Sequence, residues 1–140
     1  MKKMFSSVAV VCAALMMASC GSGKNAVAVD LSGEWNIVEV NGQQLSGDSD
    51  PFIGFDMEGK RIYGNAGCNL INGGFETSTS NAKSISFPGV ASTMMACPDM
   101  ETEGKILKAL NEVKSFDVLA GGGIGLYDAN NALVIVLEKK

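Results

Sequence analysis

Four sulfur-bearing side chains in two short segments are the strongest candidates for chemistry in this sequence. Cys68 lies in one segment, and Met94, Met95 and Cys97 lie in the other. Thiolate and thioether sulfurs are soft ligands of the kind that bind Cu(I). Adjacent side chains of an extended segment point to opposite faces, so only one of the two methionines could readily join the cysteines. We favour the alternative interpretation, in which core methionines lie beside a disulfide.

Other patterns that could support catalysis are weak. The chain contains no histidine, which removes Ser–His and Cys–His pairs and the commonest transition-metal ligand. Asp48 and Asp50 lie in a polar loop, where we expect their carboxylates to be solvated rather than to hold a cation. The glycines between residues 121 and 125 lack the Lys-Ser/Thr ending of a phosphate-binding loop. We therefore predict no enzyme activity, no metal and no cofactor.

The N-terminus has the layout of a secretory signal. Lys2 and Lys3 precede an apolar stretch over residues 5–17, which is too short to span a bilayer as a permanent helix. The stretch ends in Met17-Ala18-Ser19-Cys20, which resembles the lipobox of bacterial lipoproteins. By this resemblance, residues 1–19 are a cleaved signal peptide, and the following cysteine becomes the acylated N-terminus.

The residues after the lipidation site Cys20 predict a tether and a location. Residues 20–29 are mostly small and polar, which suits a flexible tether. In enteric bacteria an Asp after the acylated cysteine retains lipoproteins in the inner membrane, and Gly21 stands at that position here. We therefore expect a lipid-anchored protein of the cell envelope, at the outer membrane and facing the periplasm.

The redox state of the two remaining cysteines depends on this location. Export leaves Cys68 and Cys97 as an even pair in an oxidising compartment, where a disulfide is favoured. Closing a loop of roughly 30 residues would stabilise the fold by roughly 3.5 kcal/mol in the chain-entropy model. Two buried, reduced thiols are the alternative, because free cysteines commonly pack as small apolar side chains.

The charge of the mature chain restricts its partners. Without residues 1–19 the chain has 9 Lys and Arg against 15 Asp and Glu, a formal charge of −6. Binding to nucleic acid requires clustered basic side chains. We therefore predict that nucleic acid is not a partner.

Residues 30–140 predict one small, mainly β domain. Two-residue alternation or β-branched composition indicates short strands along most of this region, with tight turns at Asn41-Gly42 and Asn130-Asn131. Residues 100–113 instead place Ile106, Leu110 and other apolar side chains at helical spacing. Short strands with a single helix predict a small antiparallel barrel or a strongly curved sheet with that helix packed on it.

Three segments of this domain together resemble the META/HslJ domain family. The first is Leu31-Ser32-Gly33-Glu34-Trp35, the second covers residues 64–69, and the third covers residues 92–98. The motif positions of the last two segments are Gly64, Asn65, Gly67, Cys68, Asn69, Thr93, Met94, Met95 and Cys97. The resemblance implies a compact, lipocalin-like β-barrel packed with one helix. It supplies no catalytic residues.

The residues of the second segment suggest a structural role. Gly64 and Gly67 would allow backbone angles closed to other residues, and Asn65 and Asn69 would bond to nearby main chain. We therefore interpret residues 64–69 as a tight turn that places Cys68 opposite its partner cysteine, with a functional surface as the alternative.

The resemblance also implies candidate roles, because some members of the family are associated with heat shock, antibiotic resistance or secretion and virulence traits. Together with the N-terminal signal, the resemblance predicts an envelope lipoprotein that serves stress tolerance by binding an envelope protein or an apolar ligand. A periplasmic hydrolase inhibitor is the alternative function, and a soft-metal (copper) carrier is the third.

Overall fold

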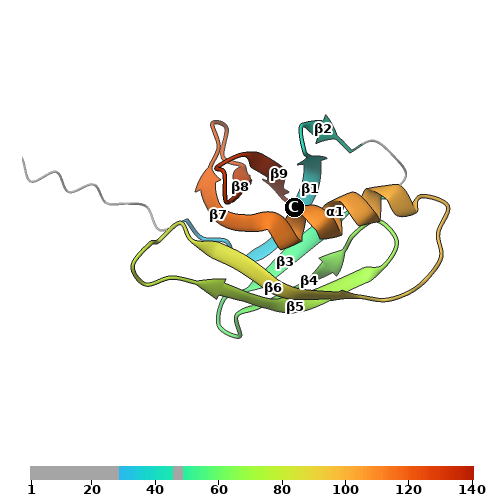
Figure 1. The fold of residues 1–140 in the computed structure, drawn as a ribbon, viewed down its shortest axis with the longest axis horizontal. Coiled ribbons are helices and arrows are strands. Elements are labelled where there is room, and N and C mark those ends of the chain that lie inside the picture. Colours follow the sequence, from blue (N-terminus) through green and yellow to red (C-terminus); the bar gives the residue numbers. More distant parts are fainter. Residues whose placement is uncertain (1–28, 46–48) are drawn as a thin grey trace, which may run out of the picture.

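The computed structural model describes residues 29–45 and 49–140. The predicted signal peptide (1–19), the lipidation site Cys20 and the predicted tether up to residue 28 lie outside the described residues. The elements follow one another along the chain (Figure 1) as β1 (Gly33–Val40), β2 (Gln43–Gln44), β3 (Phe52–Asp56), β4 (Arg61–Asn65), β5 (Leu70–Thr77), β6 (Ile85–Ser92), α1 (Met100–Glu112), β7 (Val113–Val118), β8 (Ile124–Asp128) and β9 (Leu133–Lys139).

The strands form an antiparallel, nearly closed barrel. They are hydrogen-bonded in the order β6-β5-β4-β3-β1-β9-β8-β7, and β2 pairs with β1. The two ends of this order meet where Ser84 bridges Ser115 and where the Phe116 N–H donates to the Lys83 carbonyl oxygen over 2.9 Å. The predicted fold class, a small antiparallel barrel with one helix packed on it, is confirmed.

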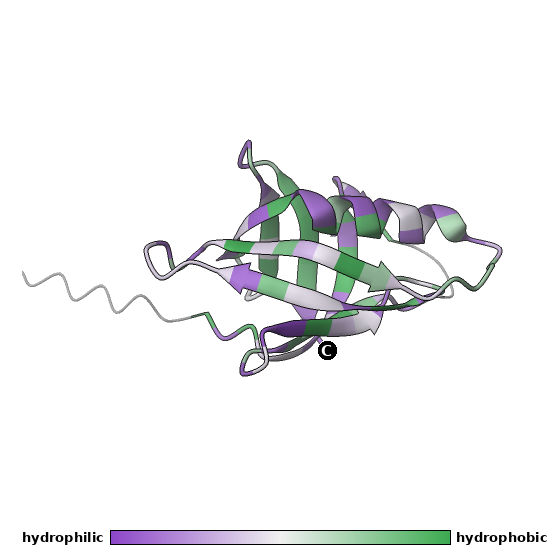
Figure 2. Ribbon diagram, turned by 60° about the horizontal axis from the view of Figure 1, so that its bottom comes forward, coloured by the Kyte–Doolittle hydropathy of each residue, from purple (hydrophilic) through white to green (hydrophobic). Residues whose placement is uncertain are grey.

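Apolar side chains fill the interior of the barrel. Buried and exposed positions alternate along β4 and most of β5, and Figure 2 shows apolar residues interspersed with polar ones on the strands. The buried apolar side chains form one cluster, made of Leu31, Trp35, Ile37, Val40, Ile53, Phe55, Ile62, Ala66, Ile71, Phe75, Ile85, Phe87, Ile106, Ala109, Leu110, Val113, Phe116, Ile124, Leu126, Val134, Ile135 and Leu137. The centre of the barrel is therefore a packed core.

The helix α1 joins β6 to β7 and packs against β6, β9 and β1 (Figure 1). Its start is fixed by Asp99, whose side chain accepts a hydrogen bond from the Thr102 N–H over 3.3 Å. Hydrogen bonds from Thr102 lower the pKa of Asp99, and the bond from the hydroxyl contributes more than the bond from the N–H. Ile106 and Leu110 are fully buried, as predicted.

Within the described ranges, no helix is long and apolar enough to cross a membrane.

The structure differs from the sequence-based expectation mainly at β5 and β6. The alternating pattern predicts strands only at residues 75–77 and 84–87, whereas the observed strands are longer. The missed part of β5 contains Gly73, where a Cβ atom would lie 2.6 Å from the Gly89 carbonyl oxygen of β6. The two backbones approach closely there, and glycines supply no apolar signal to a pattern search.

Candidate functional site

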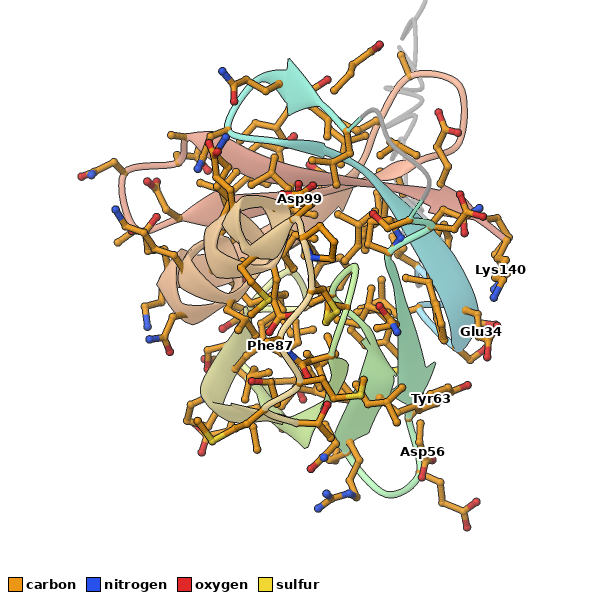
Figure 3. All side chains as sticks on the ribbon, turned by 90° about the vertical axis from the view of Figure 1, so that its right-hand side faces the viewer. Glu34, Asp56, Tyr63, Phe87, Asp99 and Lys140 are labelled. Atoms are coloured by element: carbon orange, nitrogen blue, oxygen red, sulfur yellow. A yellow bond between two sulfur atoms is a disulfide. The ribbon has the colours of Figure 1, made fainter. Side chains whose placement is uncertain are left out.

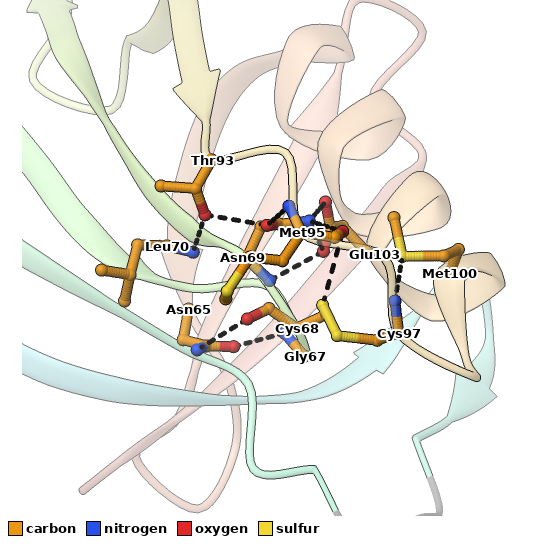
Figure 4. The surroundings of a disulfide bond; sticks show 10 residues. All are labelled: Asn65, Gly67, Cys68, Asn69, Leu70, Thr93, Met95, Cys97, Met100 and Glu103. Atoms are coloured by element: carbon orange, nitrogen blue, oxygen red, sulfur yellow. Dashed lines mark hydrogen bonds between the residues drawn. A yellow bond between two sulfur atoms is a disulfide. The ribbon is translucent and has the colours of Figure 1, made fainter.

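A disulfide joins Cys68 to Cys97, with a Cα–Cα distance of 6.0 Å (Figure 4). Cys68 lies in the turn between β4 and β5, and Cys97 lies in the connection from β6 to α1. The predicted disulfide is therefore present, and it ties that connection to the barrel. The two alternatives, buried reduced thiols and a thiolate copper site, do not match this arrangement, because sulfurs bonded to each other supply neither free thiols nor thiolate ligands.

The turn that positions Cys68 is held by its own polar groups. The Asn65 side-chain oxygen accepts the Gly67 N–H over 2.7 Å, and the Ala66 N–H donates to the Asn69 carbonyl oxygen over 3.0 Å. Gly67 has a φ of 114°, in a region that L side chains rarely adopt. These contacts agree with the predicted roles of Asn65 and Gly67.

Gly64 has a different role from the one expected. Its φ is not positive, so the interpretation that it supplies an unusual backbone angle is wrong. A Cβ atom at Gly64 would instead overlap the Phe52 carbonyl oxygen of the neighbouring strand β3. The absence of a side chain is therefore required for close approach of two backbones.

This close approach gives a testable contrast between two strand glycines. We expect Gly64→Ala to lower the free energy of unfolding by about 2 kcal/mol, because the backbones must separate to admit the methyl group. Gly74→Ala is the control, since its Cβ would meet only the Lys60 carbonyl oxygen at an ordinary 3.7 Å. Urea unfolding of both variants measures the difference, and equal losses would contradict this role of Gly64.

Two buried polar residues connect the turn to the helix. Asn69 is 1 % exposed and Glu103 is 3 % exposed. The Asn69 backbone N–H donates to Glu103 Oε2 over 2.9 Å, and Asn69 Nδ2 donates to Oε1 over 2.8 Å and to Oε2 over 3.1 Å. Among the ion pairs of the described residues, none includes Glu103. The Asn69 amides are thus the donors that satisfy this buried carboxylate.

The same asparagine also holds the connection from β6 to α1 (Figure 4). Asn69 Oδ1 accepts the Thr93 hydroxyl over 2.8 Å and the Met95 N–H over 2.7 Å, and Nδ2 donates to the Met95 carbonyl oxygen over 3.1 Å. The Thr93 N–H and hydroxyl oxygen bond in turn to the backbone of Leu70. Asn69, Thr93 and Met95 thus form one network with Glu103.

Glu103, on the helix that follows the third segment, belongs to the pattern that resembles the family, but the sequence assigns it no role. A signal was nevertheless present, because Glu103 lies three residues before Ile106 and seven before Leu110, on the apolar stripe of the helix. A carboxylate on that stripe must be buried with a partner. The partner, Asn69, is distant in sequence and could not be deduced from helical spacing.

The methionines of the third motif are exposed, which corrects the expectation that they belong to the core. Met94 is 98 % exposed, Met95 is 55 % exposed and Met100 is 42 % exposed, and Leu70, whose backbone bonds to Thr93, is 56 % exposed. We call these four residues the apolar tip. Met94, Met95 and Met100 line an open depression of about 320 Å³ together with Asn69, Thr93 and Glu103. The network below them is therefore the support of an exposed apolar surface.

The apolar tip lies at one end of the molecule. The connection between β6 and α1 is at one end of the long axis, and the chain enters the barrel toward the other end (Figures 1 and 2). Figure 3 views the molecule from the side of this connection, with Asp99 at the start of the helix. Met100 is fixed at this end, because its sulfur accepts the Cys97 N–H over 3.4 Å.

The carboxylates of the described residues do not gather into a metal site. Within the part of the chain that the structure describes, no group of three or more Cys, Asp or Glu side chains is placed to hold a metal ion. Asp48 of the polar loop lies outside the described residues, and Asp50 is exposed.

Taken together, the fold and this site define a small antiparallel β-barrel with one packed helix and a disulfide that fixes an exposed segment. The chain belongs to the META domain family, whose model matches residues 29–140. No curated protein matches the chain.

Solved structures show the same fold at low sequence identity. A protein from Burkholderia xenovorans, solved by NMR, has a TM-score of 0.61 and 19 % identity, and the match covers 82 % of this chain and 87 % of that chain. A DUF4847 family protein from Bacteroides vulgatus, solved by crystallography, has a TM-score of 0.57 and 14 % identity, with 82 % and 97 % covered. These similarities establish the fold alone.

Proposed function

We propose that this chain is a lipid-anchored protein of the bacterial cell envelope that binds a partner protein through the apolar tip and has no enzymatic activity. The observation that carries the proposal is the exposure of Leu70, Met94, Met95 and Met100 on a surface fixed by a disulfide and a buried polar network. The three methionines line one open depression, and exposed apolar patches often mark protein interaction sites. A role in envelope stress tolerance is the physiological part of the proposal, and family resemblance supports it.

The anchor is supported by the sequence pattern that ends at Cys20. Acyl chains on this cysteine would hold the protein on a membrane, because each buried methylene contributes about 0.8 kcal/mol. We expect Cys20→Ser to abolish acyl labelling and to release the domain from the membrane fraction. Fractionation followed by immunoblotting measures the release, and an unchanged membrane fraction would mean that the anchor lies elsewhere.

The position of the tip favours a protein partner over an enclosed ligand. The chain enters the barrel toward the end of the molecule away from the tip (Figure 1), so the predicted tether attaches far from the tip and leaves the tip accessible to a partner. The packed core leaves an apolar ligand only the outer surface. Site-specific cross-linking from residue 94 in living cells tests the binding role.

A hydrolase inhibitor remains the second candidate because of one observation. Residues 93–96 and Pro98 are exposed in an irregular connection that is fixed at Thr93 by the Leu70 backbone and at Cys97 by the disulfide. A rigid exposed segment of this kind is suited to enter an enzyme cleft, because little conformational entropy is lost on binding. Capture of an envelope hydrolase, with loss of its activity, would favour this candidate over a non-inhibitory partner.

A further inference from the structure

The methionines that follow the predicted signal peptide are unevenly distributed. They are Met57, Met94, Met95 and Met100, and the last three lie within seven residues on the apolar tip. Met57 is half-buried and packs against the core. Thioethers are therefore concentrated on the surface to which we assign the binding role.

Other readily oxidised side chains, namely the two cysteines and Trp35, are not available to compete with these thioethers for an oxidant. Cys68 and Cys97 are already joined in a disulfide, so they offer no thiol to an oxidant, and the one tryptophan, Trp35, is 5 % exposed. Thioethers are oxidised to sulfoxides under mild conditions, and the sulfoxide is a polar group that reductases convert back. On the described surface, the exposed methionines are thus the most readily oxidised side chains.

We propose that Met94 and Met95 form a reversible oxidation site that changes the apolar tip into a polar surface. The oxidant is a small peroxide, with hydrogen peroxide as the simplest case. The thioether sulfur attacks one peroxide oxygen, a sulfur–oxygen bond forms and the oxygen–oxygen bond breaks. Sulfur loses two electrons, and the departing oxygen leaves as water after taking up the proton from the transferred oxygen.

The structure predicts the order in which the methionines are oxidised. Met94 has the highest exposure at 98 %, and Met95 follows at 55 %. Met100 is 42 % exposed, and its sulfur accepts the Cys97 N–H over 3.4 Å, which engages electron density that an oxidant needs. Met57 is the least accessible of the four.

The consequence for binding rests on the proposed function. A sulfoxide on Met94 or Met95 adds a strongly polar oxygen to a surface whose affinity depends on apolar burial. Oxidation should therefore release the partner without unfolding the barrel, because both side chains lie outside the core. The protein would then respond to envelope oxidants at the surface that it uses for binding.

Peptide mass spectrometry of the purified full exported chain during limited hydrogen peroxide treatment tests the site. We expect sulfoxide to form at Met94 first and at Met95 next, both several-fold faster than at Met57. In urea with the disulfide intact the rates should converge, because exposure then no longer differs. Oxidation of Met57 as fast as Met94 in the folded protein would overturn the proposal.

Cross-linking from position 70 in living cells, before and after peroxide, tests the consequence. With Met94 and Met95 unchanged, the adduct from position 70 should fall several-fold on oxidation. With the substitutions Met94→Leu and Met95→Leu the adduct should persist, because leucine is apolar and resists oxidation. A wild-type adduct that survives complete sulfoxidation of both methionines would overturn the switch. Absence of any adduct before oxidation would instead refute the proposed binding role, and the oxidation map would then decide the modification site alone.

Discussion

Asn69→Ala is expected to lower the free energy of unfolding by about 3 kcal/mol, because it removes donors from a buried carboxylate. Asn69 Nδ2 donates to both oxygens of Glu103, and neither residue is more than 3 % exposed. In the variant only the backbone N–H of residue 69 would still reach that carboxylate. Urea unfolding followed by tryptophan fluorescence measures the loss.

A matched control lies on the adjoining strand. Asn72 is exposed on β5, and we expect Asn72→Ala to change the free energy of unfolding by no more than about 0.5 kcal/mol. An Asn69→Ala variant as stable as Asn72→Ala would mean that the hydrogen bonds to Glu103 are not required, and that water satisfies this carboxylate.

Removing the disulfide should lower the free energy of unfolding by as much as Asn69→Ala does, or by more. With a sequence separation of 29 between Cys68 and Cys97, the chain-entropy model gives a loss of about 3.5 kcal/mol. The paired variant Cys68→Ser, Cys97→Ser should therefore melt well below the wild-type protein in calorimetry. The bond also fixes the end of the exposed connection, so partner binding should weaken with it.

Reductant provides the control for this prediction. Wild-type protein should resist alkylation until it is reduced, and reduction should lower its melting temperature toward that of the paired variant, which should not respond to reductant. Recovery of both thiols free from protein exported under aerobic conditions would contradict the bond.

Local features of the fold were predictable because their causes are local. The apolar stripe of α1 lies within one segment, and the positive φ of Asn41 and Gly42 suits the predicted turn. The META domain motifs predicted the barrel and placed the cysteines opposite each other. The closing contact between β6 and β7 involves residues distant in sequence, which periodicity does not report.

The candidate site was only partly predictable. The sequence predicts Met94 and Met95 in the core because methionine usually fills apolar interiors, but residues 93–98 form no regular element that would turn either side chain inward. Whether they are buried depends on how Asn69 holds Met95 from a distant turn. Nothing in the spacing of residues 92–98 could reveal that contact.

The central claim is that the apolar tip is a binding surface, and site-specific photo-cross-linking in living cells tests it most directly. A photoreactive residue replaces Met94 in one strain, and Val118 of β7, also an exposed apolar residue at 48 %, in the control strain. We predict a discrete adduct with one envelope protein from position 94 and none from position 118. The same adducts at equal yield from both positions, or no adduct from position 94, would contradict the claim.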